Sequence, residues 1–99
     1  MAFLILTMDK LGTEHIRAQF RAQHYAFLEE RAASLVASGG LQDDSGETFI
    51  GAAILLDCDT RAEAEAFVAA DPFTTADLFE SVNIVRWKKA FLNGARATD

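Results

Sequence analysis

The stretch "AFVAADPFTTADLFESVNIVRW", residues 66–87, joins the end of a helix to a strand and contains the only proline of the chain. A residue that precedes proline is pushed out of the α region, so the helix should end at Ala70 or Asp71. A loop or short turn should follow. Apolar residues then alternate from Phe79 to Trp87, which predicts a final strand. The stretch therefore predicts a helix, a sharp turn and a strand in that order.

The residues just before this stretch predict a strand and the start of that helix. Thr60 and Glu63 have the spacing of a capping box, in which the hydroxyl and the carboxylate satisfy free backbone groups at a helix N-terminus. Residues 49–57 are mostly apolar and predict a buried strand. Residues 41–49 predict a short strand and a turn, because Asp43 to Gly46 are turn-forming types.

The N-terminal part predicts a strand over residues 2–8, then a loop and N-cap at Gly12-Thr13. A long helix with Glu14 in its first turn should follow and run to about Ser38. Gly39-Gly40 should end this helix as a C-cap. Helical spacing places one set of residues on a single stripe: Ile16, Phe20, His24, Phe27, Leu28 and Leu35. The element order is βαββαβ. We therefore expect an α+β, ferredoxin-like fold with a four-stranded antiparallel sheet and two helices on one face.

The predicted strands are apolar on both faces. Phe3 and Ile5 alternate with Leu4 and Leu6 in the first strand, and residues 53–56 of the buried strand show the same double pattern. Two helices cover only one face of such a sheet. We therefore expect a homodimer in which the other face packs against a second subunit.

Composition and charge exclude several classes of function. The 99 residues suffice for a single domain, and no run is long and apolar enough to predict a membrane span. A net charge of −6 disfavours nucleic acid as a partner. One cysteine and two histidines do not form a zinc motif, so we expect no metal and no cofactor. The segment "AFLILTM" lacks the flanks of a signal peptide, and we expect a cytoplasmic protein.

One pair of residues has the chemistry of a proton-transfer site. His24 is the titratable residue in the apolar stripe of the first helix, and Asp71 lies where the second helix ends. Pro72 would restrict the backbone there, and Phe73 could shield the carboxylate from water. If the two side chains meet, the acid would orient the imidazole and support its protonated form. The alternative is a packed structural histidine beside an ordinary Asp-Pro turn.

The chain resembles the YciI-like (YCII-related) family from Phe3 to about Phe91, with one domain over residues 1–99, a core of about 2–91 and a tail of 92–99. The similarity rests on "RAQHYAFLEE" (21–30), "LVASGGLQDDSG" (35–46), "GAAILLDCDTRAEAEAFVAADPF" (51–73) and "VNIVRW" (82–87). It departs from the family at Gly40 and Arg86, where a proline is common. The resemblance implies a homodimer of the dimeric α/β-barrel type.

The resemblance also implies a site made by His24 and Asp71, and Arg21 matches a basic position often seen near the family's histidine. It implies a small cofactor-independent acid/base enzyme, of lyase or isomerase type and possibly a dehydrohalogenase acting on hydroxylated aromatics. Arg21 would hold a phenolate or carboxylate. Four aromatic residues are candidates for an apolar substrate pocket: Phe20, Phe27, Phe73 and Trp87.

The main alternative is a small-molecule-binding or regulatory module without catalysis, since the same element order serves such domains. An RNA-binding sheet would need exposed aromatic and basic residues on the central strands, and residues 49–57 have neither pattern. The remaining candidates have simpler interpretations. His15 and Arg17 are interpreted as solvated, Cys58 as a small half-buried residue, and Asp43-Asp44 as part of a turn.

Overall fold

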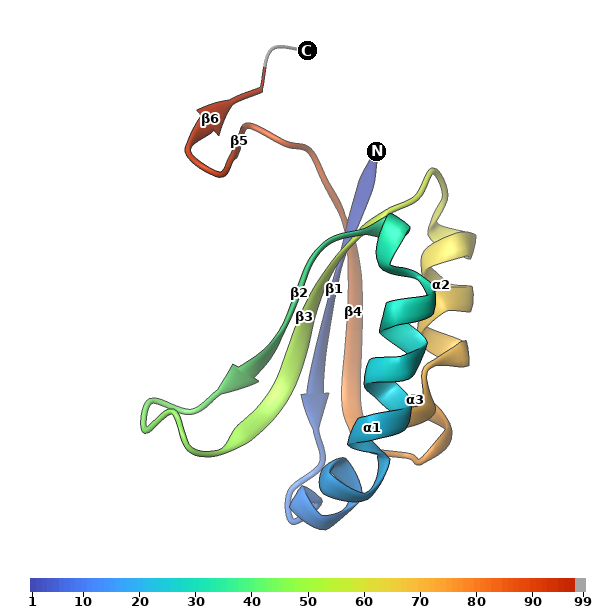
Figure 1. Ribbon diagram of the computed structural model, residues 1–99, viewed down its shortest axis with the longest axis vertical. Coiled ribbons are helices and arrows are strands. Elements are labelled where there is room, and N and C mark those ends of the chain that lie inside the picture. Colours follow the sequence, from blue (N-terminus) through green and yellow to red (C-terminus); the bar gives the residue numbers. More distant parts are fainter. Residues whose placement is uncertain (98–99) are drawn as a thin grey trace.

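The computed structural model describes residues 1–97 and contains a four-stranded antiparallel sheet in the order β2-β3-β1-β4, with the helices on one face (Figure 1). The fold is α+β and ferredoxin-like, as predicted. The elements are β1 Ala2–Asp9, α1 Glu14–Glu30, the 3-10 turn η1 Ala32–Ser34, β2 Leu35–Gln42, β3 Phe49–Asp57, α2 Arg61–Ala70, α3 Pro72–Thr75, β4 Phe79–Trp87, β5 Phe91–Leu92 and β6 Ala95–Arg96.

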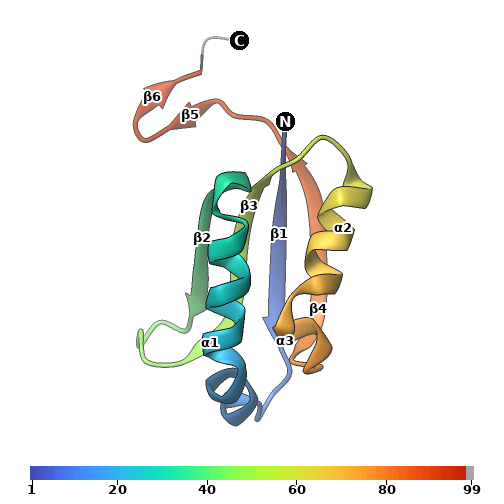
Figure 2. The same cartoon turned by 45° about the vertical axis from the view of Figure 1, so that its right-hand side comes forward.

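The core lies between the sheet and helices α1 and α2, which run side by side in front of it (Figure 2). Alternate residues of β1 and β3 face the helices, and the rings of Phe27 on α1 and Phe67 on α2 meet at 5.0 Å between centroids. The buried apolar cluster comprises Phe3, Ile5, Phe27, Leu28, Ile54, Leu56, Ala64 and Phe67. No helix among residues 1–97 is long and apolar enough to cross a membrane.

The first helix is shorter than the sequence predicts, because it ends at Glu30 and not near Ser38. The residues beyond η1 form β2, which pairs with β3 from Leu35 to Gln42. Gly39-Gly40 therefore lies inside a strand and does not cap a helix. Pairing with β3 satisfies the backbone groups of this segment, and this tertiary interaction overrides the local helical spacing.

The two predicted helix starts differ in their capping. Thr60 accepts a hydrogen bond from the backbone N–H of Glu63, as the capping-box spacing predicts. The first helix begins at Glu14 as expected, but Thr13 does not cap it with its side chain. Its hydroxyl donates instead to the carbonyl of Lys10 at 2.6 Å, which ties the loop after β1 to the helix start.

No helix or strand among residues 1–97 covers the sheet face opposite the helices (Figure 1). Because successive strand residues point to opposite faces, residues that alternate with the core positions Phe3, Ile5 and Ile54 lie on this open face. The register places on it the apolar side chains of Leu4, Leu6, Met8, Ala53, Leu55 and Val85. We use the term open face for this surface below.

Beyond β4 the chain forms a small hairpin of β5 and β6, which extends past the end of the sheet and away from both helices (Figures 1 and 2). The sequence predicts only a tail from residue 92 onward. Residues 98–99 of that tail lie outside the described part of the chain.

Candidate active site

The structure brings His24 and Asp71 into direct contact. Nδ1 of His24 lies 2.8 Å from Oδ1 of Asp71, so the two side chains meet as the sequence-based hypothesis requires. The two side chains are only 10% and 3% exposed. An ionised carboxylate can only accept hydrogen bonds, so Nδ1 carries the proton in this pair and Nε2 is left with its lone pair when the ring is neutral.

The backbone around Pro72 holds Asp71 in place. Asp71 is extended, with φ −65° and ψ 129°, and Pro72 occupies the first position of α3, where its fixed φ is favourable. Oδ1 of Asp71 also accepts a hydrogen bond of 2.9 Å from the backbone N–H of Phe73. The carboxylate therefore caps α3 and binds His24 with the same oxygen, which leaves it little freedom to move.

Phe73 fixes the plane of the imidazole. Its ring is stacked on that of His24, with 4.1 Å between centroids and 15° between planes. Phe73 is itself buried and meets Phe79 edge to face at 6.2 Å. Tyr25 also meets the imidazole, edge to face, at 5.9 Å between ring centroids and 68° between planes. The imidazole is thus held by one hydrogen bond and two aromatic contacts.

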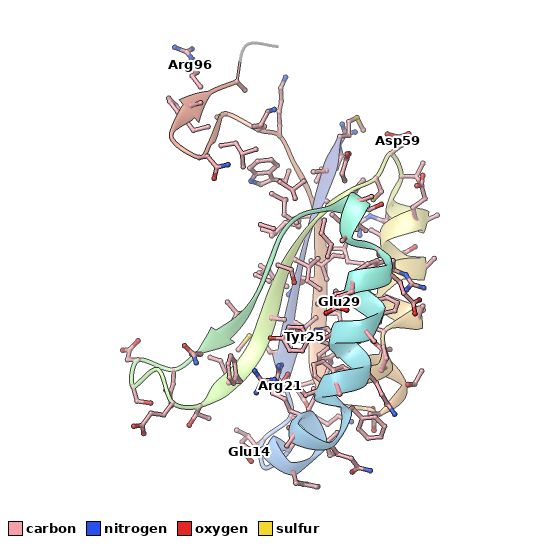
Figure 3. The ribbon with its side chains drawn as sticks, in the orientation of Figure 1. Glu14, Arg21, Tyr25, Glu29, Asp59 and Arg96 are labelled. Atoms are coloured by element: carbon pink, nitrogen blue, oxygen red, sulfur yellow. The ribbon has the colours of Figure 1, made fainter. Side chains whose placement is uncertain are left out.

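A cleft of about 260 Å³ opens beside His24, between α1 and the part of the sheet formed by β2 and β3. Among residues 1–97, Nε2 of His24 has no hydrogen-bond partner, and it is not enclosed by protein. The lining comprises Glu14, Arg17, Ala18, Arg21, His24, Tyr25, Leu28, Ser38, Gly39, Gly40, Glu47, Thr48, Phe49, Ala52 and Phe73. Figure 3 shows Arg21 and Tyr25 pointing from α1 toward these strands.

The residues of β2 that line the cleft are small: Ser38, Gly39 and Gly40. A Cβ atom built on Gly40 would lie 2.6 Å from carbon atoms of the Phe49 ring, so the ring occupies the space that a side chain would need. Ser38 and Ala52 are the neighbouring small residues on this part of the sheet. Gly40, part of the pair interpreted from the sequence as a helix cap, instead makes room for the Phe49 ring in the cleft lining, whereas Gly39 pairs with Ala53 of the other sheet face.

Arg17 belongs to this site, and its interpretation as a solvated residue is wrong. Its Nε and Nη2 donate to the two carboxylate oxygens of Asp9 at 2.8 and 3.1 Å, and Nη2 also donates to the carbonyl of Gly51 at 3.2 Å. The guanidinium lies over the ring of Phe73 at 4.9 Å and near that of Phe49 at 5.6 Å. These contacts hold a positive charge at the wall of the cleft.

A sequence signal for Arg17 exists in its spacing. Arg17, Arg21 and His24 are separated by four and three residues, so they share one face of α1. Arg21 lies at the cleft with its guanidinium 5.5 Å from the Tyr25 ring centroid. The helical spacing of Arg17, Arg21 and His24 therefore indicates that both arginines lie on the same face of α1 as the histidine, which is the face that lines the cleft.

Three of the aromatic candidates do not line the cleft. Phe27 is part of the core, and Phe20 is half-buried outside the lining. Trp87 lies at the far end of β4, opposite Ala2, whereas Phe73 contacts Phe79 at the near end. Eight residues of strand separate those ends, roughly 26 Å at 3.3 Å per residue. The structure therefore brings together His24, Asp71, Arg21 and Phe73 of the predicted site residues.

The other candidates have structural explanations. Burial, with the nearby acids Glu63, Asp57 and Asp59, raises the pKa of the Cys58 thiol, which disfavours the reactive thiolate. The Ser45 hydroxyl and backbone bonds within the turn lower the pKa of Asp43. Asp43 thereby organises its own turn, as the sequence indicates.

Comparison with known proteins gives consistent results. A profile of the YCII-related domain matches residues 1–88. Protein YciI of Escherichia coli and that of Shigella flexneri are each 26% identical over 98 residues, which span 92% of this chain and 100% of theirs. Among solved structures, the 5-chloro-2-hydroxyhydroquinone dehydrochlorinase TftG of Burkholderia phenoliruptrix AC1100, in complex with 2,5-dihydroxybenzoquinone, is 30% identical, with a TM-score of 0.83 over 90% of this chain and 95% of TftG.

Proposed function

Because this chain belongs to the YCII-related domain family, we propose that it is a small acid/base enzyme of lyase or isomerase type, acting on a hydroxylated aromatic ring. The observation that carries the proposal is the buried hydrogen bond between His24 and Asp71, with Nε2 of the imidazole open to a cleft. Enzymes that use general acid/base catalysis commonly have a histidine that is oriented by an acid in this way.

In this proposal His24 moves the proton and Asp71 positions it. Nε2 accepts a proton from a hydroxyl group of the substrate, and the imidazolium that forms is stabilised by the Asp71 carboxylate at Nδ1. The same Nε2–H then returns a proton to another atom of the ring. Phe73 keeps the imidazole plane fixed during both transfers, since it is stacked against one face.

The cleft has the features that such a substrate needs. Tyr25, Phe49 and Phe73 supply aromatic surface, and the Arg21 guanidinium provides positive charge for a developing phenolate. Arg17 is already bound to Asp9, so we assign the binding of a negatively charged substituent to Arg21. The similarity to TftG, named as a dehydrochlorinase and solved with a dihydroxybenzoquinone, supports a substrate of this class.

Loss of hydrogen chloride from a chlorinated trihydroxybenzene balances without an added oxidant. A base removes a hydroxyl proton, the ring carbon that carries chlorine is protonated, and chloride leaves with the electron pair of the C–Cl bond. After loss of a second hydroxyl proton the product is a hydroxyquinone. His24 can serve both as the base and as the acid of this sequence.

The test measures chloride release from 5-chloro-2-hydroxyhydroquinone in the absence of oxygen, with the protein and two histidine variants. We expect turnover by the protein and a loss of about 10³-fold or more in His24→Asn. His15→Asn is the matched control, because His15 is an exposed histidine on the same helix, and it should keep full activity. Equal rates for both variants would contradict the proposal.

The alternative, a binding module without catalysis, predicts a different outcome. Calorimetric titration with 2,5-dihydroxybenzoquinone would show binding that depends on Arg21, while no chlorinated hydroquinone would release chloride faster than in buffer. That pair of results would replace the enzyme by a ligand-binding protein.

We also infer that two copies form a dimer through the open face. Leu4, Leu6, Leu55 and Val85 lie there with no helix over them, and an apolar surface of this kind is rarely left exposed on a monomer. Packing against a second sheet would bury it, as the two-sided pattern of the strands indicates.

A further inference from the structure

The segment beyond β4 is built as a hairpin and not as a loose tail. Asn93 and Gly94 join β5 to β6 and have positive φ values of 52° and 78°, as the favoured two-residue hairpin turn requires. The N–H of Ala97 donates to the carbonyl of Ala90 at 2.7 Å and closes the open end. We call residues 88–97, which follow β4, the C-terminal arm.

The arm receives little support from the body of its own chain. It projects beyond the end of the sheet in both views (Figures 1 and 2), and its aromatic residue Phe91 is 62% exposed. A hollow of about 560 Å³ separates it from the sheet, lined by residues that include Trp87, Leu92, Val36 and Asp57. A two-stranded hairpin alone is only marginally stable in water, so such an element needs a surface to pack against.

The charge of this end of the chain differs in sign from that of the rest. Residues 86–97 carry four basic side chains, Arg86, Lys88, Lys89 and Arg96, and no acidic one. Residues 1–85 carry five basic and 14 acidic side chains, a balance of −9. The body of a second copy therefore has a net charge opposite in sign to that of the arm, and opposite charges guide association.

We propose that the C-terminal arm clasps a second copy of this chain, with Phe91 as its apolar anchor. The arm leaves the sheet at Trp87, which pairs with Ala2 and shares the parity of Leu4 and Val85 on the open face. A copy packed on the open face therefore lies next to the start of the arm. Exposed aromatic residues that become buried at an interface commonly dominate its binding energy. The inference rests on the dimer proposed above and is independent of the catalytic proposal.

A photocross-linking experiment tests the position of the arm in the full chain. Phe91 is replaced by the photoreactive amino acid p-benzoylphenylalanine, and the same residue is placed at Glu65, an exposed position on the outer helix α2, as the control. We expect a covalent dimer on illumination of the first variant and none with the second. If sedimentation shows a dimer but cross-links form only within single chains, the proposed contact of the arm with the second copy is wrong, and the dimer itself is not contradicted.

Two further variants measure the contribution of the arm. Phe91→Ala and the double variant Lys88→Glu/Lys89→Glu should each raise the dissociation constant of the dimer about tenfold or more, with the far-ultraviolet circular dichroism unchanged. An unchanged dissociation constant in both would contradict the proposal. A different outcome is that the protein binds a labelled single-stranded oligonucleotide that the double variant does not bind. That result would assign the basic residues to nucleic-acid binding and would also contradict the proposed role of the arm.

Discussion

Oδ1 of Asp71 accepts two hydrogen bonds, one from His24 and one from the backbone N–H of Phe73. The same oxygen therefore caps α3 and orients the imidazole of the candidate active site. The proline next to it ends one helix and begins another, so the carboxylate is held at the junction. Because the aspartate that orients the imidazole also caps α3, its position does not depend on the histidine. The acid is therefore preorganised before any ligand binds.

Asp71→Asn separates these two roles. The amide oxygen can still accept from Phe73 and His24, and asparagine is as good a helix cap as aspartate, so the free energy of unfolding should change by less than about 1 kcal/mol. The negative charge that stabilises the imidazolium is lost, and the rate of proton transfer should fall by about 10² to 10⁴-fold.

Asp77→Asn is the control for this variant. Asp77 is exposed, pairs with Lys10 and has a positive φ that asparagine tolerates. It should keep both stability and activity. A rate for Asp71→Asn within a factor of three of the unmodified protein would remove Asp71 from the mechanism.

Cys58 provides a prediction of pH dependence. Its thiol pKa is raised by burial and by acidic neighbours, so at any pH below that pKa it carries less thiolate than an exposed cysteine. Alkylation by iodoacetamide at pH 8 should therefore be slower than that of a cysteine in an unstructured peptide. The rate should keep rising at alkaline pH after the peptide has levelled off. Faster alkylation than in the peptide would contradict this assignment.

Among the elements, β2 does most to shape the site. It is an edge strand, and its pairing with β3 places Gly40 opposite Ala52 at the cleft. A larger side chain at Gly40 would displace the Phe49 ring, which contributes to the cleft lining. The small residues of β2 therefore contribute to the site because they leave room at the cleft. The opposite wall of the cleft is the face of α1 that carries Arg17 and Arg21.

Two glycine variants test this view of the sheet. A Cβ at Gly40 meets only the ring of Phe49, which is 37% exposed and can rotate, so Gly40→Ala should cost less than about 1 kcal/mol. A Cβ at Gly51 collides with the backbone carbonyl of Thr7 in β1, which cannot move alone, and Gly51→Ala should cost about 3 kcal/mol. Urea unfolding of both variants checks the order, and the reverse order would show that the strands are placed wrongly.

Helix α2 is held mainly by one aromatic residue. Phe67 is buried against Phe27 of α1, so Phe67→Ala should reduce the free energy of unfolding by about 3 to 5 kcal/mol. Val68→Ala, at a half-buried neighbouring position, should cost clearly less. Chemical denaturation measures both, and a loss below about 1 kcal/mol for Phe67→Ala would mean that another residue anchors the helix.

For the whole molecule, the open face is the basis of the proposed dimer. A single chain has helices on one side of the sheet and apolar strand residues on the other. Packing two such faces together removes apolar area from water at about 25 cal/mol per Å², which favours a dimer over a monomer with an exposed sheet.

Sedimentation velocity tests this dimer. The protein should sediment as a dimer at micromolar concentration, and Leu6→Glu, which places a charge in the middle of the open face, should shift it toward monomer. Glu65→Lys, a charge change on the outer surface of α2, should leave the dimer intact. A stable monomer of the unmodified protein would rule out the dimeric architecture.

Local physics was enough to predict the order of elements and the Asp-Pro junction. It gave the pairing of His24 with Asp71 only as one of two hypotheses, and the family resemblance favoured the pair, which the structure shows. Proline restricts its predecessor, Thr60 caps its helix, and apolar periodicity marks the strands, and each of these effects acts over a few residues. The contact between His24 and Asp71 followed because a ferredoxin-like arrangement sets the two helices side by side.

Tertiary structure alone decided where α1 ends, what Gly39-Gly40 does and which partners hold Arg17 at the site. The sequence after Glu30 is compatible with helix, but hydrogen bonding to β3, distant in sequence, makes it a strand. Arg17 resembles a solvated residue until β1 and β3 bring Asp9 and the carbonyl of Gly51 to it. Local sequence patterns encode interactions between residues that are near neighbours in the chain. The cleft, by contrast, is lined by residues of α1, β2 and β3, and only the assembled sheet brings these elements together.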